Sequence, residues 1–199
     1  MPRLQPVVRP TGLAVLLIVA GTIGLAAAGT LTLDKLHLLA DPNAQLSCSF
    51  SVLIGCATNL SSAQGNIFGF PNSLLGVVGW TVVIAIGVAI LAGARFARWY
   101  WIGLNVGVTG AIALVLWLIQ QSIFVLDILC PWCMVTWSVT FPTFLAVTFY
   151  NVKTGNIPAP ESVRRVASVA FGWLPVITLG CLIAVAVVAQ VEMDFLHRL

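Results

Sequence analysis

Five long apolar runs constrain this 199-residue chain more than any other feature. A helix of about 20 apolar residues crosses the hydrocarbon core of a bilayer, and a backbone in lipid must satisfy its own polar groups. The composition agrees, because 60% of the residues are hydrophobic and only 8% are charged. We therefore predict an all-α integral membrane protein, organised as a single membrane domain over 1–199. The predicted transmembrane helices are about 13–33, 74–94, 99–120, 131–150 and 170–191.

Basic residues are unevenly shared between the two sides of these predicted helices. Seven of the nine fall on one side, namely Arg3, Arg9, Arg95, Arg98, Lys153, Arg164 and Arg165. Because basic loops stay in the cytoplasm, this bias predicts a multi-pass protein of the cell (inner or plasma) membrane with a cytoplasmic N-terminus. The net charge of +3 then reflects topology and does not indicate nucleic-acid binding.

The first apolar run has a second interpretation as a signal peptide. It follows a basic start and contains Ala26-Ala27-Ala28, which resembles a cleavage site. The run continues through Leu33, which is long for a signal core and favours a transmembrane helix.

The longest predicted connection, about 36–71, lies on the outer side. Long loops without structure of their own are uncommon and are usually functional. This one holds Cys48 and Cys56, then a Ser/Asn/Gly-rich stretch, and ends in Phe68-Gly69-Phe70-Pro71-Asn72. Its low charge and its aromatic residues favour a short amphipathic helix that caps the outer mouth of the bundle. A merely solvated loop is the alternative.

The segment Cys130-Pro131-Trp132-Cys133 opens the fourth run, also on the outer side. Pro131 suits the first turn of a helix, where its missing N–H costs nothing. The two cysteines then share one helix face and can form or release a disulfide. A thiol at a helix N-terminus ionises more easily, because the free N–H groups and the helix dipole favour the thiolate.

Four of the five cysteines thus form two pairs on the oxidising side, where disulfides persist. On one continuous helix Cys48 and Cys56 would be about 12 Å apart, too far for a disulfide. A bond between them therefore requires a turn, which Gly55 would ease. Two neighbouring pairs can pass electrons by thiol–disulfide exchange, whereas their spacing fits a zinc site poorly, so we expect no metal. Cys181, alone in the fifth run, is best explained as a small buried hydrophobic residue.

Electrons that reach Cys130 and Cys133 need an acceptor, and the sequence has no haem, iron–sulfur or flavin motif. A membrane quinone requires only an apolar pocket with one or two hydrogen-bond donors. Asn72 and Trp137 are candidate quinone ligands, and Asp127 is a candidate proton relay. Each has a simpler alternative: a helix cap for Asn72, packing for Trp137 and a solvated loop carboxylate for Asp127.

Taken in order, these motifs resemble the vitamin K epoxide reductase family. The resemblance covers about 13–150 and rests on the cysteine spacing, on Ser61-Ser62, on Phe68–Asn72 and on the Cys130–Cys133 motif. It implies a four-helix bundle around a quinone pocket, and the fifth helix looks like the extra helix of bacterial members. Some relatives carry a fused thioredoxin-like domain. This chain ends at Leu199 without one, so we expect a separate DsbA-like thioredoxin-fold partner.

The resemblance also implies a role for each cysteine. Cys48 would accept electrons from the partner, and Cys56 would pass them to Cys130. Cys133 would reduce the quinone, either menaquinone or ubiquinone. The implied function is a membrane thiol–disulfide oxidoreductase that supports disulfide formation in exported proteins.

Three further positions match the family pattern or depart from it. Ser62 matches a serine that helps to place the loop, and Asn72 matches an asparagine that hydrogen-bonds a quinone carbonyl. Trp137 stands where vertebrate members have tyrosine. Because an indole N–H can donate but cannot accept a hydrogen bond, we favour plain quinone reduction over epoxide reduction.

Three alternative functions remain open. The first is a vitamin K epoxide or quinone reductase proper. The second is the unrelated four-helix disulfide generator, in which the two cysteine pairs occur in the reverse order. The third is a non-enzymatic membrane protein with two structural disulfides.

Overall fold

The computed structural model describes residues 10–41, 46, 48 and 54–194. Their helices are α1 (Thr11–Ala40), α2 (Ala57–Ser61), the 3-10 helix η1 (Gln64–Asn66), α3 (Asn72–Leu91), α4 (Arg98–Phe124), α5 (Pro131–Thr154), α6 (Glu161–Gly172) and α7 (Leu174–Met193). Five of them, α1, α3, α4, α5 and α7, are long and apolar enough to cross a membrane. The predicted all-α membrane fold is confirmed.

Each predicted span corresponds to one long helix, but several helices extend beyond the apolar run. Helix α1 continues to Ala40 and α4 continues to Phe124, past the predicted ends at 33 and 120. An apolar run reports where lipid contact ends, whereas backbone hydrogen bonding continues into the polar residues that follow. The prediction of a loop over 36–71 is therefore wrong for 36–40. Within that loop, residues 42–45, 47 and 49–53 lie outside the described residues.

The C-terminal part differs most from the prediction. Between the predicted spans 131–150 and 170–191, α5 runs on to Thr154 and a separate helix, α6, begins at Glu161. The helical path breaks at Trp173, so the fifth span begins at Leu174 rather than near 170. Helix α6 is amphipathic, with the charged residues Glu161, Arg164 and Arg165 among its Val and Ala residues, and this polarity hides it from a search for apolar runs.

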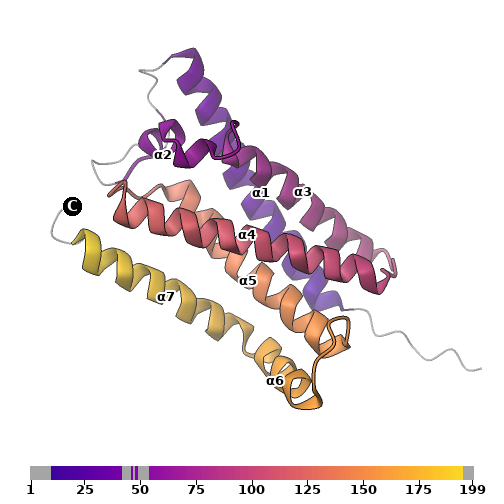
Figure 1. The fold of residues 1–199 in the computed structure, drawn as a ribbon. Coiled ribbons are helices and arrows are strands. Elements are labelled where there is room, and N and C mark those ends of the chain that lie inside the picture. The colour runs from indigo at the N-terminus through magenta and orange to yellow at the C-terminus, as the bar shows by residue number, and fades with distance from the viewer. Residues whose placement is uncertain (1–9, 42–45, 47, 49–53, 195–199) are drawn as a thin grey trace, which may run out of the picture.

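Helix α5 lies at the centre of the bundle and contacts α1, α4, α6 and α7. Helix α3 packs along α1, and α7 runs along the outer side of α5 and α4 (Figure 1). The arrangement is therefore four helices, α1, α3, α4 and α5, with α7 as an additional helix on one side. This agrees with the expected four-plus-one organisation.

Small residues bring α1 and α3 close together. A Cβ atom on Gly87 would lie 2.9 Å from the carbonyl oxygen of Ala14, and one on Gly76 would lie 2.9 Å from the Cβ atom of Ala28. Small residues allow this approach between membrane helices, where dispersion contacts replace the hydrophobic effect as the driving force. Gly79 has no heavy atom within 4 Å of its Cβ position and lines an internal cavity instead.

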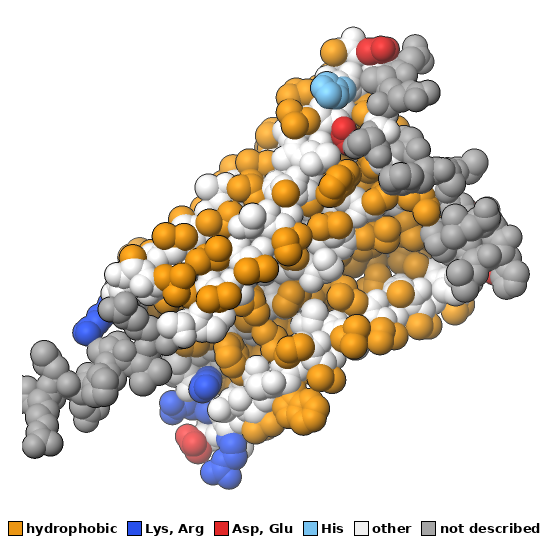
Figure 2. Space-filling model, turned by 180° about the vertical axis from the view of Figure 1, so that it is seen from behind, with side chains coloured by type: hydrophobic (Ala, Val, Ile, Leu, Met, Phe, Trp, Pro, Cys, Tyr) orange, Lys and Arg blue, Asp and Glu red, His pale blue; other side chains and the backbone are white. Residues whose placement is uncertain are grey.

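The two ends of the bundle differ in charge. Lys and Arg side chains gather at one end, around the α3–α4 and α5–α6 connections (Figure 2). At this end the Arg98 side chain donates a hydrogen bond from Nε to the carbonyl oxygen of Asn156, 2.8 Å away. Helix α2 and the start of α5 lie at the opposite end (Figure 1). The charge bias seen in the sequence is thus a polarity of the folded molecule.

Candidate functional site

Cys48 and Cys56 form a buried disulfide beside the C-terminal end of α1. Their Cα atoms are 5.8 Å apart, within the range that a disulfide requires. Cys48 is 1% exposed and Cys56 is fully buried, and Leu31, Leu46 and Leu60 pack around them. Cys56 directly precedes α2, which begins at Ala57.

A short backbone pairing places this disulfide against the second cysteine pair. Ile54 forms an isolated parallel bridge with Leu129, and the Gly55 N–H donates to the Leu129 carbonyl oxygen at 3.0 Å. Ile54 lies two residues before Cys56, and Leu129 directly precedes Cys130. As a result, the Sγ atoms of Cys56 and Cys130 lie 3.2 Å apart.

Cys130 is the N-cap of α5, as its sequence context predicts. Pro131 occupies the first turn, and the Cys130 sulfur accepts a hydrogen bond from the Cys133 backbone N–H at 3.4 Å. The side-chain hydrogen bond from Cys133 lowers the pKa of the Cys130 thiol, and the backbone N–H groups of Cys133 and Trp132 act in the same direction. Burial and the nearby charge of Asp34 oppose this lowering of the pKa but do not cancel it. Cys130 is therefore the thiol of its pair that is disposed to act as a thiolate.

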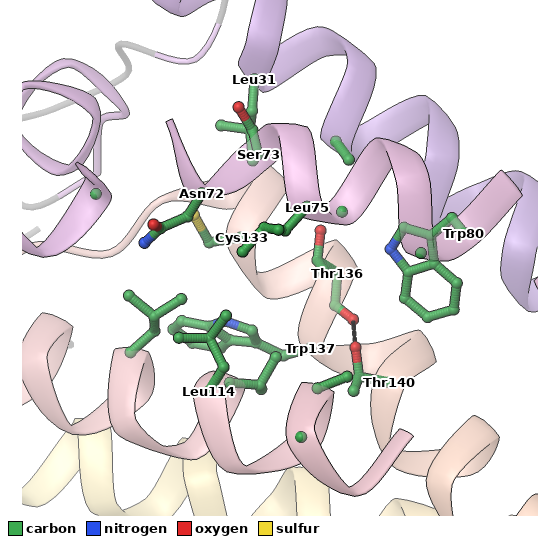
Figure 3. A pocket seen from close by; sticks show the side chains of 18 of the residues that line it. Leu31, Asn72, Ser73, Leu75, Trp80, Leu114, Cys133, Thr136, Trp137 and Thr140 are labelled. Atoms are coloured by element: carbon green, nitrogen blue, oxygen red, sulfur yellow. Dashed lines mark hydrogen bonds between the residues drawn. The ribbon is translucent and has the colours of Figure 1, made fainter. Parts of the chain in front are cut away.

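A cavity of about 630 Å³ opens beside Cys133, between α3, α4 and α5 and beneath the α2–η1 segment. Its walls are mainly apolar, with Leu31, Leu75, Trp80 and Leu114 among them (Figure 3). The polar groups that line it are Asn59, Gln64, Asn72, Ser73, Gln121, Ser122, Thr136, Trp137, Thr140 and Thr143. A large apolar space with a few polar groups suits a lipophilic ligand with a small polar head.

Asn72 lies at the start of α3 and lines this cavity together with Cys133 (Figure 3). Its side-chain oxygen accepts a hydrogen bond from the Ile67 N–H at 3.2 Å, and its amide donates to the Gln64 carbonyl oxygen at 2.7 Å. These bonds fasten the segment that covers the cavity, residues 57–71 (the capping segment), to α3. The N-cap position is Pro71 and no side-chain cap bond is present there, so Asn72 is not a helix cap. One amide hydrogen of Asn72 is left after these contacts.

Trp137 follows Cys133 by one turn of α5 and lines the same cavity. The ring is buried, packs with Leu129 and Phe141, and lies below Asn72 and Cys133 in Figure 3. The structure therefore brings both candidate quinone ligands and the inner cysteine to one space.

The two supporting candidates have different positions. The Ser62 hydroxyl donates to the Asn59 carbonyl oxygen at 2.8 Å and accepts from the Gly65 N–H at 3.1 Å, so it holds the turn between α2 and η1. Asp127 is exposed in the turn before Cys130, with a positive φ of 49°, and is not among the residues that line the cavity.

Two polar residues at this end of the molecule were missed by the sequence reasoning. Asn59 lines the cavity, and its buried Nδ2 atom has no hydrogen-bond partner among the described residues. Asp34 is buried on α1, with Oδ2 3.5 Å from the Cys48 sulfur. In the sequence, Asn59 is marked only by its place in the polar stretch before Ser62, and Asp34 only by its place at the end of the first apolar run.

Comparison with known proteins agrees with this site. A search of curated proteins found no match. The model of the vitamin K epoxide reductase family matches residues 15–148, well over half of the chain and all four cysteines of the site. The chain therefore belongs to the vitamin K epoxide reductase family and is a membrane thiol oxidoreductase with the redox-capable pair Cys48–Cys56.

Proposed function

We propose that this protein passes electrons from an extracytoplasmic thioredoxin-fold protein to a membrane quinone, through Cys48 and Cys56 and then Cys130 and Cys133. The observation that carries the proposal is the 3.2 Å separation of the Cys56 and Cys130 sulfur atoms. It links the loop disulfide to the pair beside the cavity. Sulfur atoms at that distance need only a small movement to exchange bonds.

The exchange between the pairs follows from this contact. With the loop pair reduced and the inner pair oxidised, the Cys56 thiolate attacks the Cys130 sulfur, and Cys133 leaves as a thiolate. Cys48 then attacks Cys56, which restores the loop disulfide and releases Cys130. Two electrons have moved inward. The lowered pKa of Cys130 assists the second step, because a more acidic thiol is a better leaving group.

The cavity fits a quinone by size, polarity and position. When bound, a quinone accepts two electrons and two protons, and its carbonyl oxygens need hydrogen-bond donors. Asn59 offers a buried amide without a partner, and Asn72 retains one amide hydrogen. The Trp137 indole packs the head group and can donate a hydrogen bond. Menaquinone and ubiquinone both present the carbonyl groups that these donors require.

The proposed direction places a DsbA-like protein at Cys48. The end of the bundle that holds the cysteines lies opposite the basic end, which the positive-inside rule assigns to the cytoplasm of the cell membrane. Because Cys48 is only 1% exposed, the partner reaches its sulfur only when the apolar side chains packed around it, such as Leu31 and Leu60, move aside. Ser62 is a positioning residue for the α2–η1 segment, through the turn that it holds there.

Other functions fit these observations less well. Two independent structural disulfides would have no reason to place Cys56 against Cys130, and the structure leaves Cys130 and Cys133 as free thiols. Epoxide reduction requires protonation of an epoxide oxygen. Trp137 can donate a hydrogen bond but does not ionise, so the site favours plain quinone reduction.

Quinone turnover by the purified protein tests the proposal. Reduced DsbA would serve as donor and a short-chain ubiquinone or menaquinone as acceptor, with Cys133→Ala and Cys48→Ala compared with the wild type. We expect Cys133→Ala to be inactive with any reductant, and Cys48→Ala to fail with DsbA but to recover with dithiothreitol. Absence of turnover by the wild type, or equal rates in all three proteins, would contradict the relay.

A further inference from the structure

Asp34 is a buried carboxylate with no role in the relay described above. It is 6% exposed on the outer end of α1 and is the one acidic residue among the buried polar residues of the described structure. Isolated carboxylates are costly to bury, because water solvates them far better than an apolar interior does. A buried carboxylate in an apolar cluster therefore calls for a specific explanation.

Among the described residues, Asp34 lies beside the reacting sulfur atoms. Its Oδ2 atom lies 3.5 Å from the Cys48 sulfur, and one carboxylate oxygen and the sulfurs of Cys48 and Cys56 all lie within 4.8 Å of one another. The adjacent Lys35 is engaged elsewhere, because its Nζ atom donates to the Leu60 carbonyl oxygen at 2.7 Å and so anchors α2 to α1. His37, which is exposed, is the titratable neighbour along α1 whose charge reaches Asp34.

We propose that Asp34 is the acid–base group of the Cys48–Cys56 pair: it protonates Cys48 when the disulfide is opened and takes the proton back when the disulfide re-forms. This inference rests on the proposed relay for its direction. It assigns a catalytic role to a residue that touches the reacting sulfur.

The contact between Asp34 and Cys48 suits a protonated carboxyl when the disulfide is formed and an ionised carboxylate when it is reduced. A disulfide sulfur carries no hydrogen, so an ionised carboxylate at 3.5 Å would face only its lone pairs, whereas a protonated carboxyl can donate to it. After reduction, the Cys48 thiol can donate to an ionised Asp34. The proton on Asp34 is thus expected to follow the redox state of the pair.

The proton and electron balance closes over one cycle. A donor thiolate attacks Cys48, and Cys56 leaves as a thiolate. The second donor thiol loses its proton to water and attacks the donor sulfur of the mixed disulfide, the donor departs as a disulfide, and Cys48 leaves as a thiolate that Asp34 protonates. When Cys48 later attacks the Cys56–Cys130 mixed disulfide, the Asp34 carboxylate removes the same proton. The donor has lost two electrons, the inner pair has gained them, and Asp34 ends as it began.

The test measures reduction of the loop disulfide alone. Full-length protein in detergent would be mixed with dithiothreitol, quenched with acid and alkylated, and reduced Cys48 and Cys56 would be counted by mass spectrometry at several pH values. General acid–base groups contribute about 10²-fold or more. We expect the loop disulfide of Asp34→Asn to be reduced about 10²-fold more slowly at neutral pH. The dependence of this reduction rate on pH should lose one step in Asp34→Asn and keep it in Asp34→Glu.

Controls separate proton transfer from structure. His37→Gln should keep the step, which would exclude His37 as its source. Unchanged kinetics in Asp34→Asn, or slower kinetics with an unchanged pH profile, would overturn the proposal. The proposal would also be overturned if Asp34→Asn slowed reduction equally in a Cys48→Ala background, where dithiothreitol must reduce the inner pair directly. Because the assay uses no quinone, its result is independent of whether the relay to quinone is correct.

Discussion

At the scale of single residues, Cys130 combines a helix N-cap with a sulfur contact to the other pair. The Cys133 side chain contributes most to favouring the Cys130 thiolate, and the backbone N–H groups at the start of α5 act in the same direction. An arrangement in which the fold itself stabilises the leaving thiolate needs no separate basic residue.

The thiolate of Cys130 should persist to lower pH than an ordinary thiolate. With the loop disulfide intact and Cys181→Ala as background, thiolate absorbance at 240 nm would be titrated with and without Cys133→Ala. Loss of the Cys133 donor should shift the midpoint to higher pH. Because the pKa of Cys130 is lowered in the fold, ionisation stabilises the folded state above the ordinary thiol pKa, and that stability is lost as the pH falls through the lowered value. Identical titrations in the two proteins would count against this account.

Asn59 should lower the stability of the free protein and strengthen its binding of quinone. Its buried Nδ2 atom lacks a partner, so Asn59→Leu should stabilise the free protein by roughly 1 kcal/mol and raise its melting temperature. The same change should raise the KM for quinone about fivefold, which corresponds to one lost hydrogen bond of roughly 1 kcal/mol. Melting curves and steady-state kinetics would be compared. A lower melting temperature with unchanged KM would show that the amide is merely structural.

Residue-level chemistry could be predicted from the sequence where the residue type is rare and its spacing is diagnostic. Both cysteine pairs, Asn72 and Trp137 were identified in this way. Asp34 and Asn59 were not, because their significance depends on burial and on neighbours far away in the sequence. A carboxylate at the end of an apolar run looks like the beginning of a loop until the helix is seen to continue to Ala40.

At the scale of elements, the glycines of α4 divide into those that face the cavity and those that do not. Gly107 lines the cavity, while Gly103, one turn earlier, does not. Neither has a heavy atom within 4 Å of its Cβ position, so an added Cβ atom meets no protein atom at either site. The two positions form a matched pair.

Filling the cavity from α4 should block the quinone site without disturbing the fold. We expect Gly107→Leu to lower quinone turnover at least tenfold, by an estimate of roughly 1.4 kcal/mol or more in lost binding, with the Cys48–Cys56 and Cys130–Cys133 exchange intact. Gly103→Leu should behave as wild type. Quinone kinetics and a thiol count after single-turnover reduction would be measured on both, and equal activity would argue against this cavity as the quinone site.

Elements were predictable from the sequence to the extent that lipid contact defines them. All five spans were found, but α6 was missed because its polar face interrupts the apolar pattern. The 54–56 and 129–130 pairing was also missed, since a single backbone bridge leaves no periodic signal. Yet this bridge is what brings the two cysteine pairs together.

At the scale of the whole molecule, the charge polarity predicts its orientation in the membrane. Pro158, in the α5–α6 connection, lies at the basic end, and the exposed Phe68 lies in the capping segment. In a cysteine-free variant, we expect Phe68→Cys to react with an impermeant maleimide in intact cells and Pro158→Cys to react only after lysis. The reverse pattern would invert the assigned topology and exclude an extracytoplasmic donor.

The molecule as a whole functions as proposed only if electrons cross from one cysteine pair to the other. That step can be trapped. In a Cys181→Ala background, Cys48→Ala with Cys133→Ala leaves Cys56 and Cys130, whose sulfurs lie 3.2 Å apart. The matched control, Cys56→Ala with Cys133→Ala, leaves Cys48 and Cys130.

Peptide mass spectrometry after mild oxidation is the most direct measurement of this central claim. We predict rapid and nearly complete formation of a Cys56–Cys130 disulfide in the first variant, and little cross-linking in the control. Free thiols in the first variant, or equal cross-linking in both, would contradict the account, because the sulfur contact on which the relay depends would not be a route for exchange.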